Sequence, residues 1–217
     1  MSLAEKVVII GAGDHGRSTF EILREACRHN GHHELLGFLD DSPQKKGSVV
    51  AGLPVLGGLD WIASQHSSGV AYVIGVADTR AKQHIVQCLA SRSVTFVSAI
   101  HPSVIMASGV RVAAGAIVNA GVTIAYDALI EEHTTINLNA TIGHDCIVGR
   151  FSTIAPGANV AGRVHVGEGC DIGLNAAVAK GVEIGEWSSL GPGTVVIKDV
   201  APGHSMFGNP ARVVPTL

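Results

Sequence analysis

The sequence predicts two successive folds in one chain of 217 residues: an α/β domain built on a parallel sheet, followed by a parallel β-helix. Three observations support this prediction. Strand and helix patterns alternate over the first hundred residues, an aliphatic residue then recurs at every sixth position, and 27 glycines accompany an aromatic content of only 4%. A core of this composition is built from branched aliphatic and small side chains, with many tight turns.

The first half alternates between strand and helix patterns. Short apolar stretches predict strands at residues 6–10, 34–41, 71–78 and 94–102. Apolar residues at helical spacing predict helices at 16–30 and 79–92. Strand–helix–strand units of this length predict a parallel sheet covered by helices.

From about residue 104 the apolar period changes to six. Every sixth residue from Val112 to Val196, fifteen in all, is Val, Ile or Leu. Wherever the repeat continues, the residue four places later is Ala, Val, Thr, Cys or Ser. A period of six fits neither an α-helix nor a lone strand, and is typical of a parallel β-helix in which three hexads form one triangular coil. The aliphatic residue is expected to point into the prism and the smaller one to fill a corner. Fifteen hexads predict five coils, roughly 24 Å tall at about 4.8 Å between strands.

Composition excludes several classes of protein. A formal net charge of −3 argues against a nucleic-acid partner, and no apolar stretch is long enough to span a membrane. The first residues lack the pattern of an export signal. No C-x-x-C spacing occurs among the four cysteines, Cys27, Cys88, Cys146 and Cys170. Scattered thiols without an export signal predict a cytoplasmic protein.

The hexapeptide pattern resembles that of the hexapeptide-repeat acyltransferases, whose coils are left-handed, against the usual crossover rule. With GAGDHG and LDD in the first half and GNPAR after the repeat, the whole chain resembles the sialic-acid O-acetyltransferase and nucleotide 4-amino-sugar N-acetyltransferase family. The resemblance implies a Rossmann-like sugar-nucleotide domain over 1–102, a left-handed β-helix over 103–199 and a tail over 200–217. It also implies acetyl-CoA as co-substrate, and a homotrimer with active sites between subunits.

His144 and Asp145 stand side by side in the stretch ATIGHDCIVG (140–149), where the chain nears a corner. The residues one coil away from His144 are Tyr126 and Gly162, and the glycine leaves room beside the imidazole. An adjacent carboxylate orients one ring nitrogen and raises the basicity of the other. Acetyl transfer needs a base near neutral pH, so His144 is the predicted general base and Asp145 its orienting carboxylate. The resemblance gives an HD or HE pair in this coil the same two roles.

The resemblance places the acetyl-CoA groove along the prism, between neighbouring subunits. It implies donor contacts at Thr153, Gly162, Leu174 and Pro192, with Lys180, Lys198 and Arg212 as candidate partners for the CoA phosphates. Thr153 stands where many relatives carry a histidine that touches the thioester carbonyl, and its hydroxyl is expected to donate a hydrogen bond instead. The backbone N–H of Gly162 is the expected oxyanion donor, because glycine allows close approach.

Gly11, Gly13 and Gly16 match G-x-G-x-x-G between a strand and a helix, a pattern typical of nicotinamide-dinucleotide binding. Asp40 stands where a ribose-binding acid would be expected, so a dehydrogenase-like function is one alternative. Against it, the α/β half has only about a hundred residues, and no second catalytic domain follows except the β-helix.

The resemblance instead places the nucleotide of a sugar substrate at this loop. It implies a site lined by Gly13, Asp14, His15, Asp40, Asp41, Gly75 and Arg80. Relatives usually have glycine in place of Asp14. A carboxylate beside a pyrophosphate is unfavourable, so Asp14 is expected to weaken binding or to point away.

No metal is expected. Spacings of 11 and 21 residues between His133, His144 and His165 do not place three ligands around one point. The leading hypothesis is an acetyl-CoA-dependent N-acetyltransferase that acetylates the 4-amino group of a GDP- or UDP-linked 4-amino-4,6-dideoxy sugar, by direct attack in a ternary complex. The alternatives are an O-acetyltransferase of sialic acid or another polysaccharide sugar, and a non-catalytic, nucleotide-binding trimeric scaffold.

Overall fold

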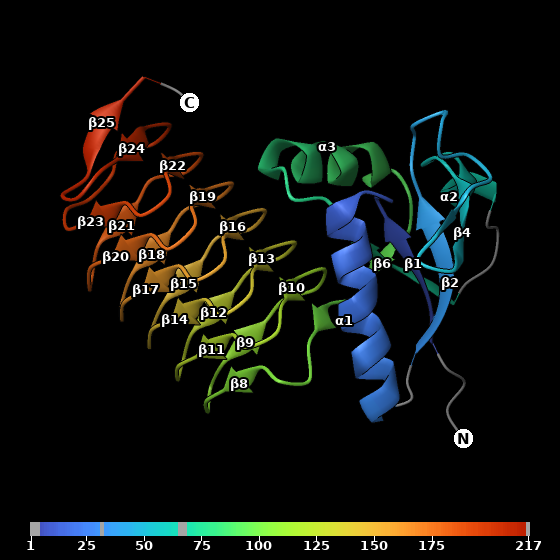
Figure 1. Cartoon of the computed structure of the whole chain (residues 1–217), viewed down its shortest axis with the longest axis horizontal. Helices are drawn as coiled ribbons and strands as arrows, with labels where there is room; N and C mark the ends of the chain where they lie inside the picture. The colour runs from blue at the N-terminus through green and yellow to red at the C-terminus, as the bar shows by residue number, and fades with distance from the viewer. Residues whose placement is uncertain (1–4, 31–32, 65–68, 216–217) are drawn as a thin grey trace.

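The computed structural model describes residues 5–30, 33–64 and 69–215, which form an α/β domain and a prism packed side by side (Figure 1). The domain contains one six-stranded sheet, and the prism has three flat sheets as its faces. The predicted fold class is confirmed: a Rossmann-like domain precedes a left-handed parallel β-helix.

The N-terminal sheet has the strand order β3-β4-β2-β1-β5-β6, and only β3 runs antiparallel to its neighbour. Its strands are β1 (Glu5–Ile10), β2 (His33–Leu39), β3 (Val49–Val50), β4 (Leu53–Gly57), β5 (Val70–Ile74) and β6 (Thr95–Phe96). Helix α1 (Asp14–Asn30) covers one face of the sheet, and α2 (Trp61–Ser64) and α3 (Thr79–Leu89) cover the other. The β3–β4 hairpin and α2 are additions to the predicted elements.

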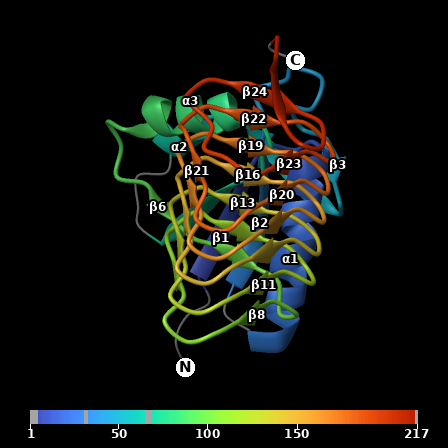
Figure 2. The same ribbon diagram turned by 90° about the vertical axis from the view of Figure 1, so that its left-hand side faces the viewer.

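The coils stack with strands in three parallel columns, which we name faces I, II and III (Figure 2). Face I contains β7 (Ala99–Ile100), β10 (Ile117–Val118), β13 (Thr135–Ile136), β16 (Thr153–Ile154), β19 (Asp171–Ile172), β22 (Ser189–Leu190), β24 (Ser205–Phe207) and the antiparallel β25 (Arg212–Val214). Face II contains β8 (Ile105–Met106), β11 (Thr123–Ile124), β14 (Thr141–Ile142), β17 (Asn159–Val160), β20 (Ala177–Val178) and β23 (Val195–Val196). Face III contains β9 (Arg111–Val112), β12 (Leu129–Ile130), β15 (Ile147–Val148), β18 (His165–Val166) and β21 (Glu183–Ile184).

The six-residue period explains the inside of the prism. Aliphatic residues of the repeat, such as Ile124, Ile136 and Val148, are fully buried in one continuous core, and the smaller residues that follow them fill the corners. Every sixth residue from Gly109 to Gly193 adopts a positive φ. This left-handed conformation turns the chain at a corner and favours glycine, although several of these positions hold other residues.

The prism begins earlier than predicted. The stretch 94–102, expected to be one strand of the first domain, is divided: β6 pairs with β5 of the N-terminal sheet, whereas β7 pairs with β10 of face I. The reason is visible in the repeat, because Ile100 and Met106 continue the six-residue register backwards from Val112. Face I also continues into the predicted tail through β24. Two faces therefore carry more than the five strands that fifteen hexads predict.

The N-terminal domain covers face I of the prism. Ala99 and Ile117 point outward from this face and belong to the same apolar cluster as Phe20 of α1. By contrast, Ile105 on face II and Ile147 on face III are exposed.

Lys82 of α3 connects the middle coils of face I to the N-terminal domain. Its side chain is only 1% exposed. Its Nζ donates to Thr153 Oγ1 at 3.0 Å and to the Ser152 carbonyl at 3.2 Å, and lies 3.4 Å from Thr135 Oγ1. Burial lowers the pKa of Lys82 from 10.5 to about 7, although the nearby Asp171 and Asp78 oppose this shift.

Candidate active site

His144 lies at the corner between faces II and III, just after β14 ends. Its ring stacks on Tyr126 of the coil below, with centroids 5.1 Å apart and planes 13° apart. On the other side it lies against Gly162, where an added Cβ would clash with His144 Nε2. The prediction that Gly162 makes room for the imidazole is therefore consistent with the packing.

Asp145 holds the imidazole in a defined orientation. Its Oδ2 lies 2.6 Å from His144 Nδ1, and its backbone adopts a left-handed φ of 56°, which turns the chain at the corner. With a proton on Nδ1 donated to the carboxylate, Nε2 carries the free lone pair. The His144 side chain is 28% exposed, so a substrate can reach it.

Gly162→Ala is expected to lower the rate of acetyl transfer at least tenfold while the chain still folds. The φ of Gly162 is negative, so alanine fits the backbone, but its Cβ displaces the His144 ring. The measurement is kcat/KM together with the thermal unfolding midpoint. Gly181→Asn is the matched control, because Gly181 lies at the adjacent corner position in open space, with a positive φ that asparagine tolerates. Equal activity of Gly162→Ala and wild type would contradict the placement of His144.

The predicted donor-binding residues lie on different parts of the prism. The N–H of Gly162, beside His144, has no hydrogen-bond partner within the described residues. Leu174 and Pro192 are exposed at the corner between faces I and II. Lys198 and Arg212 are exposed and line one cavity near the top of the prism.

Thr153 is not free to meet a thioester. It is 7% exposed under the N-terminal domain. Its Oγ1 accepts a hydrogen bond from Lys82 and donates one to the Ala77 carbonyl at 3.1 Å. The Thr153 hydroxyl is therefore used in packing the N-terminal domain against the prism.

The glycine loop is a close contact between β1, α1 and β5. A Cβ on Gly16 would clash with the carbonyl oxygen of Gly11, and one on Gly75 would clash with the backbone of Gly16. Gly75 is thus a packing residue beneath the loop. Gly13 differs, because an added Cβ would meet only Lys45 Nζ, at 4.0 Å. The loop is therefore open to a ligand at Gly13.

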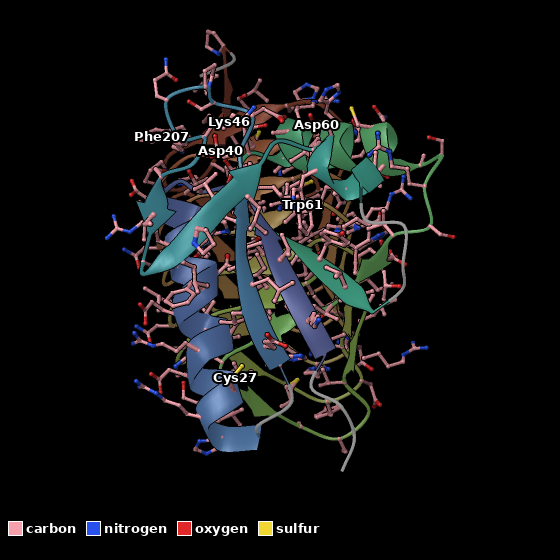
Figure 3. The ribbon with its side chains drawn as sticks, turned by 90° about the vertical axis from the view of Figure 1, so that its right-hand side faces the viewer. Cys27, Asp40, Lys46, Asp60, Trp61 and Phe207 are labelled. Atoms are coloured by element: carbon pink, nitrogen blue, oxygen red, sulfur yellow. The ribbon has the colours of Figure 1, made fainter. Side chains whose placement is uncertain are left out.

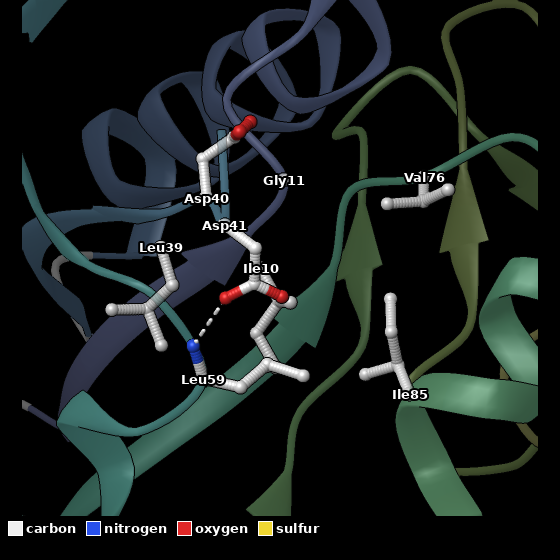
Figure 4. Close-up of a pocket in the computed structure, with 8 residues that line it drawn as sticks. All are labelled: Ile10, Gly11, Leu39, Asp40, Asp41, Leu59, Val76 and Ile85. Carbon is white, nitrogen blue, oxygen red and sulfur yellow. Dashed lines mark hydrogen bonds between the residues drawn. The ribbon is translucent and has the colours of Figure 1, made fainter. Parts of the chain in front are cut away.

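Two cavities open at the carboxyl ends of β1, β2 and β5, where ligands of parallel sheets usually bind. The first is mostly apolar and is lined by Ile10, Gly11, Leu39, Asp40, Asp41, Leu59, Val76 and Ile85 (Figure 4). At its edge the N–H of Leu59 donates to Asp41 Oδ1 at 2.9 Å (Figure 4). The second is lined by Ala12, Gly13, Asp14, Arg17, Lys45, Val49, Val50 and Ala51.

Asp14 begins helix α1 and lines the second cavity. Its side chain is fully exposed and lies 3.6 Å from Arg17 Nη1. His15, in the first turn of α1, is half-buried, and its Nε2 has no partner among the described residues. Burial, with a further contribution from Lys82, lowers the pKa of His15 from 6.5 to about 4.

Arg80 does not line either cavity. Its guanidinium lies 3.6 Å from the ring centroid of Trp187, at the corner between faces III and I. Helix α3 packs against the prism and carries Arg80 with it, so the role of Arg80 in closing the nucleotide pocket stays a prediction.

His144 and the glycine loop of one chain lie on opposite sides of the prism. The N-terminal domain sits on face I, and the corner between faces II and III is the opposite vertex of the triangular cross-section. A face of six residues spans up to about 20 Å at about 3.3 Å per residue. A single chain therefore does not bring its own two sites together.

Two further features concern metals and membranes. Within the described ranges, no group of three or more His, Cys, Asp and Glu side chains is placed to hold a metal ion. None of the helices that the structure describes is long and apolar enough to cross a membrane.

Comparisons with known proteins place the chain in a family. The family model of the PglD N-terminal domain matches residues 6–89. No curated protein sequence matches the chain. Among solved structures, PerB from Caulobacter crescentus, in complex with CoA and GDP-perosamine, is 31% identical, with a TM-score of 0.88 and 97% of both chains covered.

Two other solved structures are similar over nearly the whole chain. The acetyltransferase domain of PglB from Neisseria gonorrhoeae, in complex with acetyl coenzyme A, is 27% identical, with a TM-score of 0.88 and coverage of 97% of this chain and 100% of that one. WeeI from Acinetobacter baumannii is 26% identical, with a TM-score of 0.86 and coverage of 96% and 99%.

Fold and site together define a left-handed β-helix acyltransferase with a Rossmann-like N-terminal domain. The predicted family and enzyme class are thus confirmed. The chain belongs to the hexapeptide-repeat nucleotide 4-amino-sugar N-acetyltransferases.

Proposed function

We propose that the enzyme transfers an acetyl group from acetyl-CoA to the 4-amino group of a GDP- or UDP-linked 4-amino-4,6-dideoxy sugar. The observation that carries this is the pair His144–Asp145, which leaves Nε2 free at an open corner of the prism. Support for the substrates comes from PerB, which is 31% identical over 97% of the chain and was solved with CoA and GDP-perosamine.

The reaction proceeds by direct attack in a ternary complex. The amine nitrogen attacks the thioester carbonyl carbon while His144 Nε2 takes a proton from that nitrogen. The N–H of Gly162 donates to the oxygen that becomes negative. When the C–S bond breaks, the imidazolium returns the proton to the departing CoA sulfur. Asp145 stabilises the charged imidazolium throughout.

No side chain at the site is suited to carry the acetyl group covalently. Cys146 and Cys170 are fully buried at corners, and burial raises the pKa of both thiols, that of Cys170 to about 11. A neutral, enclosed thiol is a poor nucleophile. Direct transfer is therefore favoured. All four cysteines are free, which fits the cytoplasm, where we place the reaction.

The nucleotide sugar binds at the glycine loop, with Gly13, His15 and Asp41 facing it. Acetyl-CoA lies along the prism, over Leu174 and Pro192 of one chain and Gly162 of another, and its phosphates lie near Lys198 and Arg212. Because His144 and the glycine loop of one chain are on opposite sides of the prism, two chains must share each active site. A closed ring of three provides such shared sites, so we propose a homotrimer.

Mixing two inactive variants is expected to restore activity if subunits share the site. His144→Asn removes the base, and Gly13→Leu fills the open side of the glycine loop. After reassociation of a 1:1 mixture, about one quarter of the sites combine an intact His144 with an intact Gly13 from the neighbour. Activity at about that fraction of wild type is the expected result. No recovery in subunits shown to have exchanged would mean that each chain uses its own residues.

The experiment that tests the function is release of free CoA thiol from acetyl-CoA. The acceptors are UDP- and GDP-linked 4-amino-4,6-dideoxyhexoses and free sialic acid. Rapid turnover with one nucleotide amino sugar is the expected result. Turnover with sialic acid alone would make the enzyme an O-acetyltransferase. Absence of turnover with every acceptor, together with absence of acetyl-CoA binding, would leave a nucleotide-binding scaffold.

A further inference from the structure

Asp40 accepts three hydrogen bonds from its own chain. Its Oδ2 accepts from the N–H of Ala12 at 2.9 Å and from Lys45 Nζ at 2.9 Å, and its Oδ1 accepts from the N–H of Ser42 at 3.0 Å. Only 14% of its side chain is exposed. Burial opposes ionisation, yet the bonds from Lys45, Ala12 and Ser42 hold the pKa of Asp40 below its ordinary value. The carboxylate therefore has little capacity left for a sugar hydroxyl.

Those bonds link two parts of the second cavity. Through Ala12, Asp40 fixes the glycine loop, and through Lys45 it fixes the segment that follows β2. Figure 3 shows Asp40 near the upper end of the sheet. The Asp40 carboxylate thus sets the distance between the loop and the Lys45 ammonium.

Lys45 is positioned over the open part of the loop. Its Nζ lies 4.0 Å from the position that a Cβ on Gly13 would occupy, and its side chain remains 37% exposed. An ammonium group has three protons, and the structure shows one of them used by Asp40. The remaining protons are available to a ligand above Gly13.

The cavity wall favours an anion at this point. Lys45 and Arg17 are its two cationic lining residues, and its one acidic lining residue, Asp14, is fully exposed and lies 3.6 Å from Arg17 Nη1. The first turn of the 17-residue helix α1 adds unpaired N–H groups. The negative charge of a diphosphate complements these cationic groups. The first cavity is mostly apolar and suits a planar base instead.

We propose that Lys45 binds the diphosphate of the nucleotide sugar, and that Asp40 is a positioning residue that holds Lys45 against the glycine loop. The assignment rests on the proposed function, because it takes the ligand to be a nucleoside diphosphate sugar. The sequence places Asp40 where a ribose-binding acid would be expected, and this assignment gives it a different role.

The test is calorimetric binding to the full-length protein of UDP, GDP, dTDP, CDP and ADP and of the corresponding nucleosides. Lys45→Met is expected to weaken the best diphosphate about 10–100-fold, the loss of one charged hydrogen bond, and to leave the nucleoside unchanged. Lys46→Met is the matched control, since Lys46 is exposed and lies outside the residues that line the cavity. It is expected to bind like wild type.

Asp40→Asn is expected to weaken diphosphate binding in the wild-type background and to have little further effect in Lys45→Met. Such coupling identifies a residue that acts through Lys45, because a general loss of loop structure would weaken both backgrounds equally. If Lys45→Met binds the diphosphate like wild type, the role of Lys45 is overturned while the proposed function stands. If wild type binds none of the five diphosphates, both are overturned.

Discussion

Replacing His144 by asparagine is expected to lower kcat by about 10²–10⁴-fold, the usual contribution of a positioned general base. Asparagine fits between Tyr126 and Gly162 and keeps a polar group near Asp145, but it has no basic nitrogen. The amine must then lose its proton to water as it attacks. The measurement is single-turnover acetyl transfer at saturating acceptor, with acetyl-CoA binding followed separately by calorimetry.

Two results separate catalysis from structure. We expect acetyl-CoA to bind to His144→Asn within a few-fold of wild type, because the side chain is replaced by one of smaller volume at a partly exposed corner. His165→Asn is the control for histidine loss, since His165 is exposed on face III, one coil above Ile147. An active His144→Asn enzyme would remove His144 from the mechanism.

The prism was predictable because the interior of a β-helix repeats one environment. Each aliphatic position meets the same position of the coils above and below, so the register alone gives His144 its neighbours Tyr126 and Gly162. The left-handed corners were harder to predict. Phe151 and Trp187 adopt positive φ at the corner where Gly115 and Gly169 do so in other coils, and local preference does not anticipate aromatic residues there.

What the sequence could not provide is how the two parts pack together. Thr153 and Arg80 were assigned to ligand sites by position in a motif, yet both are used between the domain and the prism. Lys82 resembles an ordinary solvated helix residue in the sequence, and its burial depends on α3 meeting face I. Lys45 was missed for a similar reason, because a lysine five residues after Asp40 in a loop has no fixed geometry until the loop folds.

His133 is a buried histidine between the N-terminal domain and the prism, and we expect it to lower the stability of the fold in acid. His133 is 6% exposed, stacks on Phe151 at 5.6 Å and meets the edge of Phe96 at 4.6 Å. Its Nδ1 has no partner among the described residues. Burial, then the charge of Lys82, lowers the pKa of His133 from 6.5 to about 4, although Glu132 opposes this. His15 shows the same direction.

The direction of this pH effect follows from the protons bound by the folded and by the unfolded chain. Above pH 6.5 these imidazoles are neutral whether the chain is folded or unfolded, and their full contribution to stability is present. As the pH falls from 6.5 to 4, the unfolded chain takes up protons that the folded chain refuses, so the free energy of unfolding decreases. A histidine with a pKa of about 4 in the fold contributes at most about 3 kcal/mol to this loss.

His133→Phe is expected to reduce the acid sensitivity while preserving the fold. Phenylalanine suits this backbone, because Phe151 occupies the equivalent corner one coil above with a φ of 63°, close to the 56° of His133. The added ring stacks on Phe151 and has no site for a proton. Urea unfolding at fixed protein concentration between pH 7.5 and 4.5 should show about half the wild-type loss of unfolding free energy, because His15 still titrates. His165→Asn, which replaces an exposed histidine, should retain the full loss. If His133→Phe loses stability with acid as steeply as wild type, the neutral His133 imidazole is not the source of the effect.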